Sequence, residues 1–139
     1  MAFRIRQPVR HPDVDRAGIV YFPRFYDFFH RALEDFFRDE VGMPYHSVEE
    51  QLRVAMPVVR IETDFESPLA HGDLVTIELE TEKIGKHSVT LRYRIFRPGA
   101  TEPAAVSRTV ICCIEVPGWK KISVPENVRR AFERHLVAP

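Results

Sequence analysis

The chain has few cysteines, no long uncharged stretch and no excess of either charge. Its two cysteines are neighbours, Cys112 and Cys113. Neighbours in a strand point to opposite faces, so we expect two reduced core thiols rather than a disulfide. The longest uncharged stretch, Val41 to Val48, has eight residues, whereas a bilayer span needs about 20. Residues 1–6 carry arginines where a signal peptide has an apolar stretch. We therefore expect a cytoplasmic protein with no membrane partner.

Positive and negative charges balance along the chain. Lys and Arg together number 20, Asp and Glu together number 20, and the formal net charge is zero. Proteins that bind nucleic acid rely on long-range attraction to phosphates, so no nucleic-acid partner is expected. With 139 residues, 45% of them hydrophobic, the chain predicts a single domain over 1–139, because two halves would each be too small for a good core.

A helix with an unusually broad apolar face is predicted from Pro23 to about Glu40. Its apolar side chains cover an arc of about 200° on a helical wheel, whereas a typical surface helix shows little more than about 100°. Proline suits the first helical position because its missing N–H removes no helical hydrogen bond. Gly42 then marks the end of the helix. A helix this apolar has to be wrapped rather than covered on one side.

Runs that alternate between apolar and polar residues indicate an antiparallel sheet with one apolar face. They lie at residues 3–9, 59–65, 75–80, 89–95 and 104–116. A three-residue hairpin at 85–87 would put the apolar faces of two neighbouring runs on the same side. It would also set Glu80 opposite Arg92 and Glu78 opposite Arg94, which is a favourable cross-strand pattern.

The order of these elements predicts an α+β fold. One strand is followed by the long helix and then by four strands, and residues 125–136 form a short terminal helix. The arrangement resembles the hotdog fold, in which a curved antiparallel sheet of five to six strands is wrapped around a long central helix.

The segment from Asp13 to Pro23 is the strongest candidate for chemistry. It places Asp13 and Asp15 in a turn with Gly18, a few residues ahead of a helix amino terminus. Free N–H groups at such a terminus can stabilise a developing oxyanion. A nearby carboxylate can attack an acyl carbon or deprotonate the attacking water. Acidic turns before helices are also common without any catalytic role.

A resemblance to the 4-hydroxybenzoyl-CoA thioesterase family of hotdog proteins is carried by the run Asp13-Val14-Asp15-Arg16-Ala17-Gly18-Ile19-Val20-Tyr21-Phe22-Pro23. The similarity continues through Gly42 and Pro44 and recurs weakly at 57–59 and 73–78. It implies an acyl-CoA thioesterase for an aromatic or a short- to medium-chain acyl group, in which Asp15 is the catalytic nucleophile or general base. It also implies that the backbone N–H of Phe22 binds the carbonyl oxygen of the thioester.

Three departures from the family pattern bear on the substrate. Arg16 stands where the family has a proline, and it either lies beside the carboxylate of Asp15 or points to solvent. His30 replaces an acidic residue of the aryl-specific members, so selection of a 4-hydroxybenzoyl group is not expected. His30 is either a pocket residue or a half-buried interface histidine. Phe22-Pro23 replaces a His-Ala pair, which favours an aromatic acyl group.

The remaining site assignments follow from the same resemblance. Substrate contacts are assigned to Tyr21, Phe25, His30, Met56 and Pro57. The hairpin residues Lys86, His87 and Ser88 are assigned to the phosphates of CoA, although solubility alone would also explain Lys86. CoA is part of the substrate, so no cofactor and no metal are expected. The resemblance further implies a homodimer or homotetramer with the active site at the contact between two subunits.

Two other functions remain open. A hotdog hydratase or dehydratase would need a histidine base paired with a carboxylate, a role that only His30 or His87 could take. A non-catalytic protein of the same fold would bind acyl-CoA without hydrolysing it. A metal cluster of His11, Asp13 and Asp15 is disfavoured, because no second His or Cys group stands at ligand spacing. The cysteines are expected to be inert, since an apolar strand raises the pKa of a thiol.

Overall fold

The computed structural model describes residues 1–137. Its strands are β1 (Phe3–Pro8), β2 (Val54–Ala55), β3 (Val58–Phe65), β4 (Leu74–Ile84), β5 (Ser88–Phe96), β6 (Ala105–Cys112) and β7 (Ile114–Glu115). Its helices are α1 (Arg24–Phe36), α2 (Val48–Leu52) and α3 (Glu126–Glu133), with a π-helical turn η2 (Phe37–Val41) and the 3₁₀ turns η1 (His11–Asp13) and η3 (Tyr45–Ser47). Across these residues no helix combines the length and apolar character that crossing a membrane requires.

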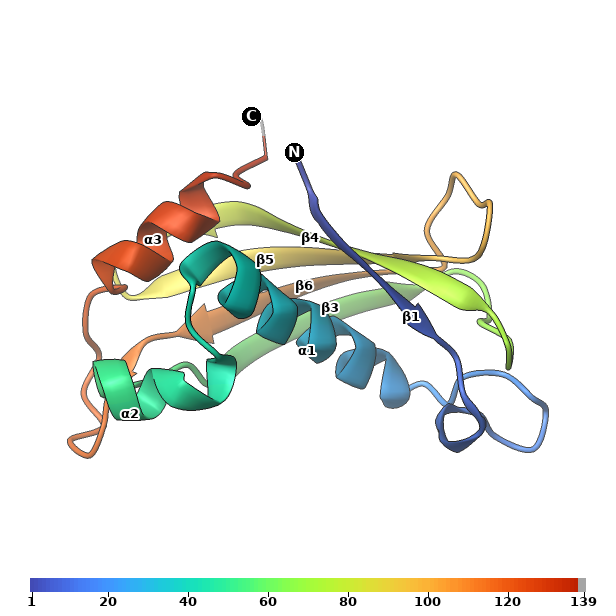
Figure 1. The fold of residues 1–139 in the computed structure, drawn as a ribbon, viewed down its shortest axis with the longest axis horizontal. Helices are drawn as coiled ribbons and strands as arrows, with labels where there is room; N and C mark the ends of the chain where they lie inside the picture. The colour runs from blue at the N-terminus through green and yellow to red at the C-terminus, as the bar shows by residue number, and fades with distance from the viewer. Residues whose placement is uncertain (138–139) are drawn as a thin grey trace.

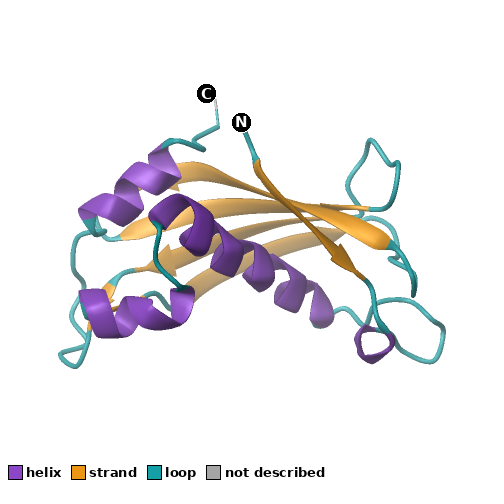
Figure 2. Ribbon diagram, in the orientation of Figure 1, coloured by secondary structure: helices purple, strands orange, loops and turns teal. Residues whose placement is uncertain are grey.

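Five antiparallel strands form the main sheet in the order β1-β4-β5-β6-β3, and β2 and β7 form a second, two-stranded sheet. Helix α1 lies across one face of the main sheet, and α2 and α3 lie at the end of the molecule where α1 finishes (Figures 1 and 2). The predicted α+β architecture, a sheet around one long helix, is confirmed.

The broad apolar face of α1 fills the core. Phe28, Ala32 and Phe36 are fully buried at helical spacing. Phe29 stacks on Tyr93 of β5 with ring centroids 5.1 Å apart, and Phe36 stacks on Phe132 of α3 at 4.8 Å. Each fully buried phenylalanine contributes about 1.5–3 kcal/mol to the free energy of unfolding.

The end of α1 differs from the prediction of a single helix reaching Glu40. The regular helix stops at Phe36 and continues as the wider π-helical turn η2. Gly42 takes a left-handed conformation with φ 78°, and the amides of Gly42 and Met43 both donate to the carbonyl oxygen of Phe37. These longer-range bonds widen the last turn while Gly42 ends it, as predicted.

The face of the sheet opposite α1 carries paired charges. Glu78 lies opposite Arg94 and Glu80 opposite Arg92, as predicted. The guanidinium of Arg94 donates to Oε1 of Glu78 at 2.8 Å and to Oε1 of Glu80 at 2.9 Å. The two glutamates are only 7% and 8% exposed, so the arginines compensate carboxylates that the sheet has largely desolvated.

The hairpin between β4 and β5 differs in detail from the prediction. The loop 85–87 separates the two strands, but a bulge between Thr81 and Lys83 shifts the register by one residue. The last pair is therefore Ile84 with Val89, and four residues rather than three lie between its members. Period-two alternation does not reveal such a bulge, because one extra residue leaves each half of the pattern intact.

The two edges of the main sheet have different surfaces. At one edge, β1 carries Arg4, Arg6 and Pro8. At the other edge, β3 exposes the apolar side chains of Val58 (51%), Val59 (61%), Ile61 (45%) and Phe65 (45%). An apolar edge strand with free backbone groups is a template for pairing with another strand.

Candidate active site

Asp15 lies at the tip of a tight hairpin between β1 and α1. Its amide donates to the carbonyl oxygen of Ile19 at 2.9 Å, and the amide of Gly18 donates to the carbonyl oxygen of Asp15 at 3.0 Å. One carboxylate oxygen, Oδ1, accepts a hydrogen bond from the amide of Ala17 at 2.9 Å. The side chain is exposed, and within residues 1–137 its second oxygen accepts no hydrogen bond, so that oxygen is available to a substrate or a water.

The local sequence explains this geometry. An aspartate at the start of a turn commonly accepts a hydrogen bond from the amide two residues later, as Asp15 does from Ala17. The turn then needs a residue with positive φ, and Gly18 supplies it at 79°. The spacing Asp-x-Ala-Gly therefore fixes one oxygen of the carboxylate and leaves the other free.

Backbone hydrogen bonds hold the Asp15 hairpin on two sides. The amide of Tyr21 donates to the carbonyl oxygen of Asp13 at 3.0 Å, and the amide of His71 donates to that of Gly18 at 3.0 Å. Asp13 is buried, and its Oδ2 accepts the amide of Arg10 at 2.9 Å. The two acidic residues thus differ in role: Asp13 fits the interpretation of an acidic turn residue, whereas Asp15 keeps a free carboxylate oxygen.

The start of α1 offers an unpaired amide. The N–H groups of Arg24 and Phe25 donate to the carbonyl oxygens of Tyr21 and Phe22. The N–H of Phe22 donates to no acceptor in the described part of the chain, and Phe22 is 58% exposed. Partial positive charge accumulates at a helix amino terminus. This N–H can therefore donate a hydrogen bond to the carbonyl oxygen of a bound ligand.

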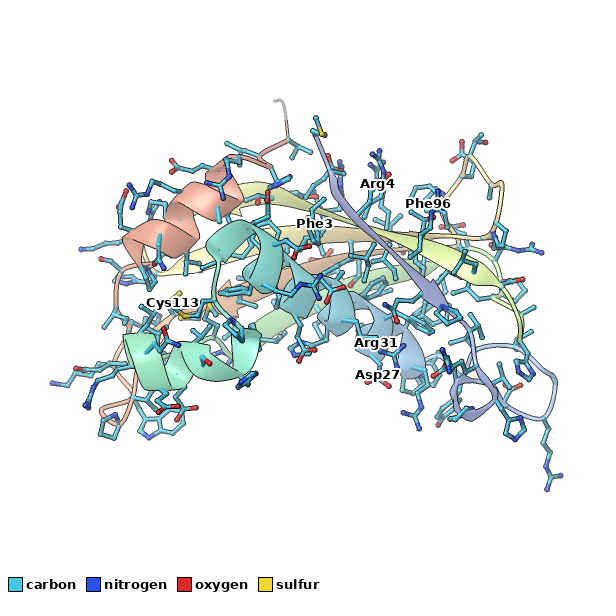
Figure 3. The ribbon with its side chains drawn as sticks, viewed as in Figure 1. Phe3, Arg4, Asp27, Arg31, Phe96 and Cys113 are labelled. Carbon is cyan, nitrogen blue, oxygen red and sulfur yellow. The ribbon has the colours of Figure 1, made fainter. Side chains whose placement is uncertain are left out.

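A cleft of about 270 Å³ lies between α1 and the β3 side of the sheet. It is lined by Tyr26, Asp27, Phe29, His30, Leu33, Val58, Ile61, Tyr93, Thr109 and Ile111. Tyr26, Phe29 and Leu33 follow one another at helical spacing, so the cleft runs along one face of α1, beginning in the first turn of the helix. Figure 3 labels Asp27 on this helix, one turn before Arg31.

The structure places the five predicted substrate residues in different surroundings. His30 lines the cleft, with its ring edge-on to Tyr45 at 5.1 Å. Tyr21 is exposed next to Phe22, and Phe25 is buried, 5.1 Å from the ring of Phe65. Met56 lines a neighbouring cavity of about 230 Å³ that it shares with Tyr45. Pro57 is exposed, and its carbonyl oxygen accepts the amide of Cys112 at 3.0 Å.

The predicted CoA residues lie at the opposite end of the sheet from Asp15. The Asp15 hairpin adjoins the segment just before β4, and Lys86, His87 and Ser88 follow the far end of that strand (Figure 1). An 11-residue strand at about 3.3 Å per residue is roughly 33 Å long. Within one chain the structure therefore does not bring these residues together with Asp15.

Of the residues that line the cleft, only His30 was predicted as a substrate contact, and Tyr93 and Thr109 are two strand residues with hydroxyl groups that were missed. Tyr93 and Thr109 line the floor of the cleft, on the sheet face that the alternating pattern assigns to the core. The available signal was chemical: Tyr93 places a hydroxyl among apolar inward residues, and Thr109 places one beside the buried Ser107 of the same run.

The cysteines supply no competing nucleophile. Cys112 and Cys113 are both free and buried, as predicted, and Figure 3 labels Cys113 at the end of the molecule near α2. Burial raises the pKa of Cys113 to about 11, with a smaller contribution from Cys112, which keeps the thiol protonated at neutral pH. Among residues 1–137 no three His, Cys, Asp or Glu side chains converge in a way that would hold a metal ion.

A five-stranded antiparallel sheet around one long helix is the architecture of hotdog-fold thioesterases. A sequence profile described as the thioesterase-like superfamily matches residues 9–132, and the chain belongs to that superfamily. The predicted family and enzyme class, an acyl-CoA thioesterase, are thereby confirmed.

Particular relatives are named 1,4-dihydroxy-2-naphthoyl-CoA hydrolase. The one from Prochlorococcus marinus is 32% identical over 102 residues, which are 68% of this chain and 65% of that protein. The one from Nostoc punctiforme is 28% identical over 133 residues, or 96% of this chain and 88% of that protein. The crystal structure of a 1,4-dihydroxy-2-naphthoyl-CoA thioesterase from Synechocystis matches with a TM-score of 0.86 and 26% identity, covering 95% of this chain and 96% of that one. The predicted hotdog fold is confirmed.

Proposed function

We propose that the protein hydrolyses an aromatic acyl-CoA to the free acid and CoA. The observation that carries the proposal is that the free oxygen of Asp15 and the free amide of Phe22 belong to one hydrogen-bonded segment, 13–23. This segment leads directly into the helix face that borders the cleft. A carboxylate and an oxyanion donor are the two groups that thioester hydrolysis requires.

In this mechanism the carbonyl oxygen of the thioester accepts the N–H of Phe22. Negative charge grows on that oxygen in the tetrahedral transition state, and the helix amino terminus stabilises it. Asp15 supplies the attacking oxygen in one of two ways: its carboxylate adds to the carbonyl carbon, or it removes a proton from a water that adds there. In both cases the carbon–sulfur bond breaks, and CoA leaves as a thiolate that is then protonated. In the first case a water hydrolyses the anhydride between Asp15 and the acyl group, which releases the free acid and restores the carboxylate. In the second case Asp15 gives the proton that it took from the water to the thiolate or to solvent.

The aromatic side chains that line the cleft support the proposal of an aromatic acyl group. Tyr26, Phe29 and Tyr93 all line the cleft, and its volume of about 270 Å³ lies just below the usual range for small-molecule pockets. The relatives named above take a bicyclic aromatic acyl group, according to their names. A compact ring system is therefore a better match for this cleft than a long acyl chain.

We propose that the active enzyme is a homodimer, or a tetramer built from such dimers, that pairs along β3. The exposed apolar edge of β3 supports this, because it leaves Val58, Val59 and Ile61 uncovered in the single chain. If two β3 strands pair antiparallel, the main sheet of the partner subunit runs in the opposite direction to that of the first subunit. The partner's hairpin 85–88 would then lie at the same end as Asp15 of the first subunit, and Lys86 could contact the CoA phosphates from there.

Two further assignments complete the proposal. We place the enzyme in the cytoplasm, a location supported by two buried, unpaired thiols. We expect turnover to need no cofactor, because the carboxylate and the backbone amide supply the attack and the oxyanion contact. Turnover should therefore survive dialysis against a metal chelator.

The experiment is a spectrophotometric screen of thiol release. Benzoyl-, hydroxybenzoyl-, phenylacetyl- and straight-chain acyl-CoA esters are compared, and enoyl-CoA hydration is assayed in parallel. We expect thiol release to be fastest with the aroyl esters. A preference for straight chains would refute the aromatic assignment, hydration of enoyl-CoA would indicate a hydratase, and tight binding without turnover would indicate a non-catalytic acyl-CoA-binding protein.

A further inference from the structure

The cleft beside α1 has a second cavity as its neighbour. That cavity has a volume of about 230 Å³, and Tyr45, Val48, Val54, Ala55 and Met56 are among the residues that line it. Val48, Val54 and Met56 are buried, so its floor is apolar. Among residues 1–137 the two cavities have no lining residue in common. Side chains therefore separate them.

A pair of rings forms this separating wall. His30 lines the cleft and Tyr45 lines the second cavity, and their rings meet edge-on, with centroids 5.1 Å apart and planes at 89°. On the strand side, Met56 lines the second cavity and Val58, two residues later, lines the cleft. The two cavities are thus adjacent, and only the His30–Tyr45 pair stands between them on the helix side.

Tyr45 is the firmer half of the wall. It lies in η3, and its ring also meets the ring of Phe37 edge-on at 5.1 Å. Phe37 is fully buried, and edge-to-face contacts are a favourable arrangement of aromatic rings. His30 is exposed, and its Nε2 lies 3.6 Å from Oε1 of Glu34. A ligand could therefore push His30 aside more easily than Tyr45.

The wall lies at the end of the cleft that is remote from the reacting carbon. At a rise of about 1.5 Å per residue, His30 lies roughly 12 Å beyond Phe22 along the axis of α1. An acyl group whose carbonyl oxygen accepts the amide of Phe22, and which extends along the helix, passes Tyr26 and Phe29 first. Its far end then meets His30 and Tyr45.

We propose that Tyr45 closes the far end of the acyl cleft and thereby limits the length of the acyl group that the enzyme accepts. The inference rests on the proposed function and deepens it, because it names a specificity-determining residue. A group that ends before the wall keeps its contacts with the cleft. A longer group has to displace the ring of Tyr45 from His30 and Phe37, and this cost is added to its transition state.

The test is a length series of esters on the unmodified protein, on Tyr45→Ala and on Tyr45→Phe. Benzoyl-CoA is compared with its 4-methyl, 4-propyl, 4-pentyl and 4-heptyl derivatives, and hexanoyl- to dodecanoyl-CoA are assayed in parallel. In the unmodified protein we expect kcat/KM to fall at least tenfold at one step of the series. Tyr45→Ala joins the two cavities and should raise kcat/KM beyond that step about tenfold, relative to benzoyl-CoA. Tyr45→Phe keeps the ring and should keep the limit.

Refilling the second cavity is the matched control. Ala55 lines that cavity and not the cleft, so Ala55→Leu alone should leave the length limit unchanged. Combined with Tyr45→Ala, it occupies the space that a longer acyl group would enter, and it should restore the limit. This non-additive result distinguishes joined cavities from a general loosening of the fold. Thermal unfolding checks that each variant is folded, and Tyr45→Leu replaces Tyr45→Ala if the alanine variant is not.

Each outcome bears on the inference. A length limit that is unchanged in a folded Tyr45→Ala or Tyr45→Leu protein overturns it and leaves the proposed function intact. An unmodified protein without a length limit overturns it as well, and so does a gain for long esters that Ala55→Leu fails to reverse. A preference for straight chains refutes the aromatic assignment, while the straight-chain series still tests the limit. A protein that releases thiol from no acyl-CoA ester refutes the proposed function, and this inference with it.

Discussion

The backbone N–H of Tyr21 donates to the carbonyl oxygen of Asp13 at 3.0 Å, and this bond joins the hairpin that carries Asp15 to the segment from which α1 begins. The next residue, Phe22, supplies the free amide. The carboxylate and the oxyanion donor therefore belong to one short, internally bonded unit. A displacement of the hairpin would move both groups relative to a substrate held in the cleft.

The first prediction concerns the carboxylate. Asp15→Asn should lower kcat about 10²- to 10⁴-fold, because the amide is neither a nucleophile nor a base. The fold should be unchanged, since Asn retains an oxygen that can accept the amide of Ala17. Thiol release and circular dichroism measure the two effects.

Asp13→Asn is the control for this change. It is the same substitution two residues earlier, on a side chain that accepts the amide of Arg10 and that we place outside the reaction. Its kcat should stay within about threefold of the unmodified protein. A folded Asp15→Asn protein with nearly full activity would remove Asp15 from the mechanism.

The second prediction concerns the turn. Gly18 has φ 79°, and a Cβ added there would meet no atom within 4 Å. Any loss of stability in Gly18→Ala would therefore come from the left-handed backbone conformation and not from a clash. We expect a loss of about 1–2 kcal/mol in the free energy of unfolding, measured in urea, together with a fall in kcat as the hairpin loosens. Gly18→Asn should recover much of both, because Asn tolerates the left-handed region. Equal losses in the Ala and Asn variants would show that conformation is not the cause.

The third prediction concerns the thiols. The raised pKa of Cys113, about 11 against an ordinary 9, leaves about a hundredfold less thiolate at pH 8 than a free cysteine. Native protein should react with a thiol reagent at least that much more slowly than protein unfolded in urea. Because the pKa is raised in the folded state, the stabilising contribution of this group is complete below about pH 9 and is lost as the pH rises towards about 11. Rapid labelling of the native protein at pH 8 would contradict this.

The fourth prediction concerns the β3 edge. Val59→Lys places a charge on the exposed apolar edge and should shift the protein from dimer to monomer in light-scattering chromatography. Activity should fall with it, if CoA is held by the partner's Lys86. Leu74→Lys is the control, since Leu74 is also exposed (49%) but lies on β4, away from that edge. A Val59→Lys protein that remains dimeric would exclude pairing along β3.

The sequence predicted most of the fold because its patterns were local. The register that sets Glu78 opposite Arg94 follows from period-two alternation and charge pairing, and it was confirmed. The pattern could not show that β3 is an edge strand, since Ile61 would alternate in the same way in an interior strand. Nor could it show the bulge after Thr81, which adds one residue without breaking either half of the run.

The candidate site was predictable only where a single segment contains it. Asp15 and Phe22 stand on one continuous stretch, so their spacing was visible in the sequence. Lys86 follows the far end of β4, and which end of a sheet a hairpin occupies depends on tertiary topology. Tyr93 was hidden for another reason: an inward-pointing tyrosine of an alternating run is assigned to the core, and only the folded structure shows that it also lines the cleft.

The contrast between the two margins of the sheet has a consequence for assembly. The β1 edge is a poor template for a further strand, because it carries Arg4, Arg6 and Pro8. The apolar β3 edge can pair with one. A subunit with a single receptive side can join one other subunit, after which no receptive side remains. Strand addition is thus self-limiting, and the same asymmetry that permits a pair protects the protein from growing into fibres.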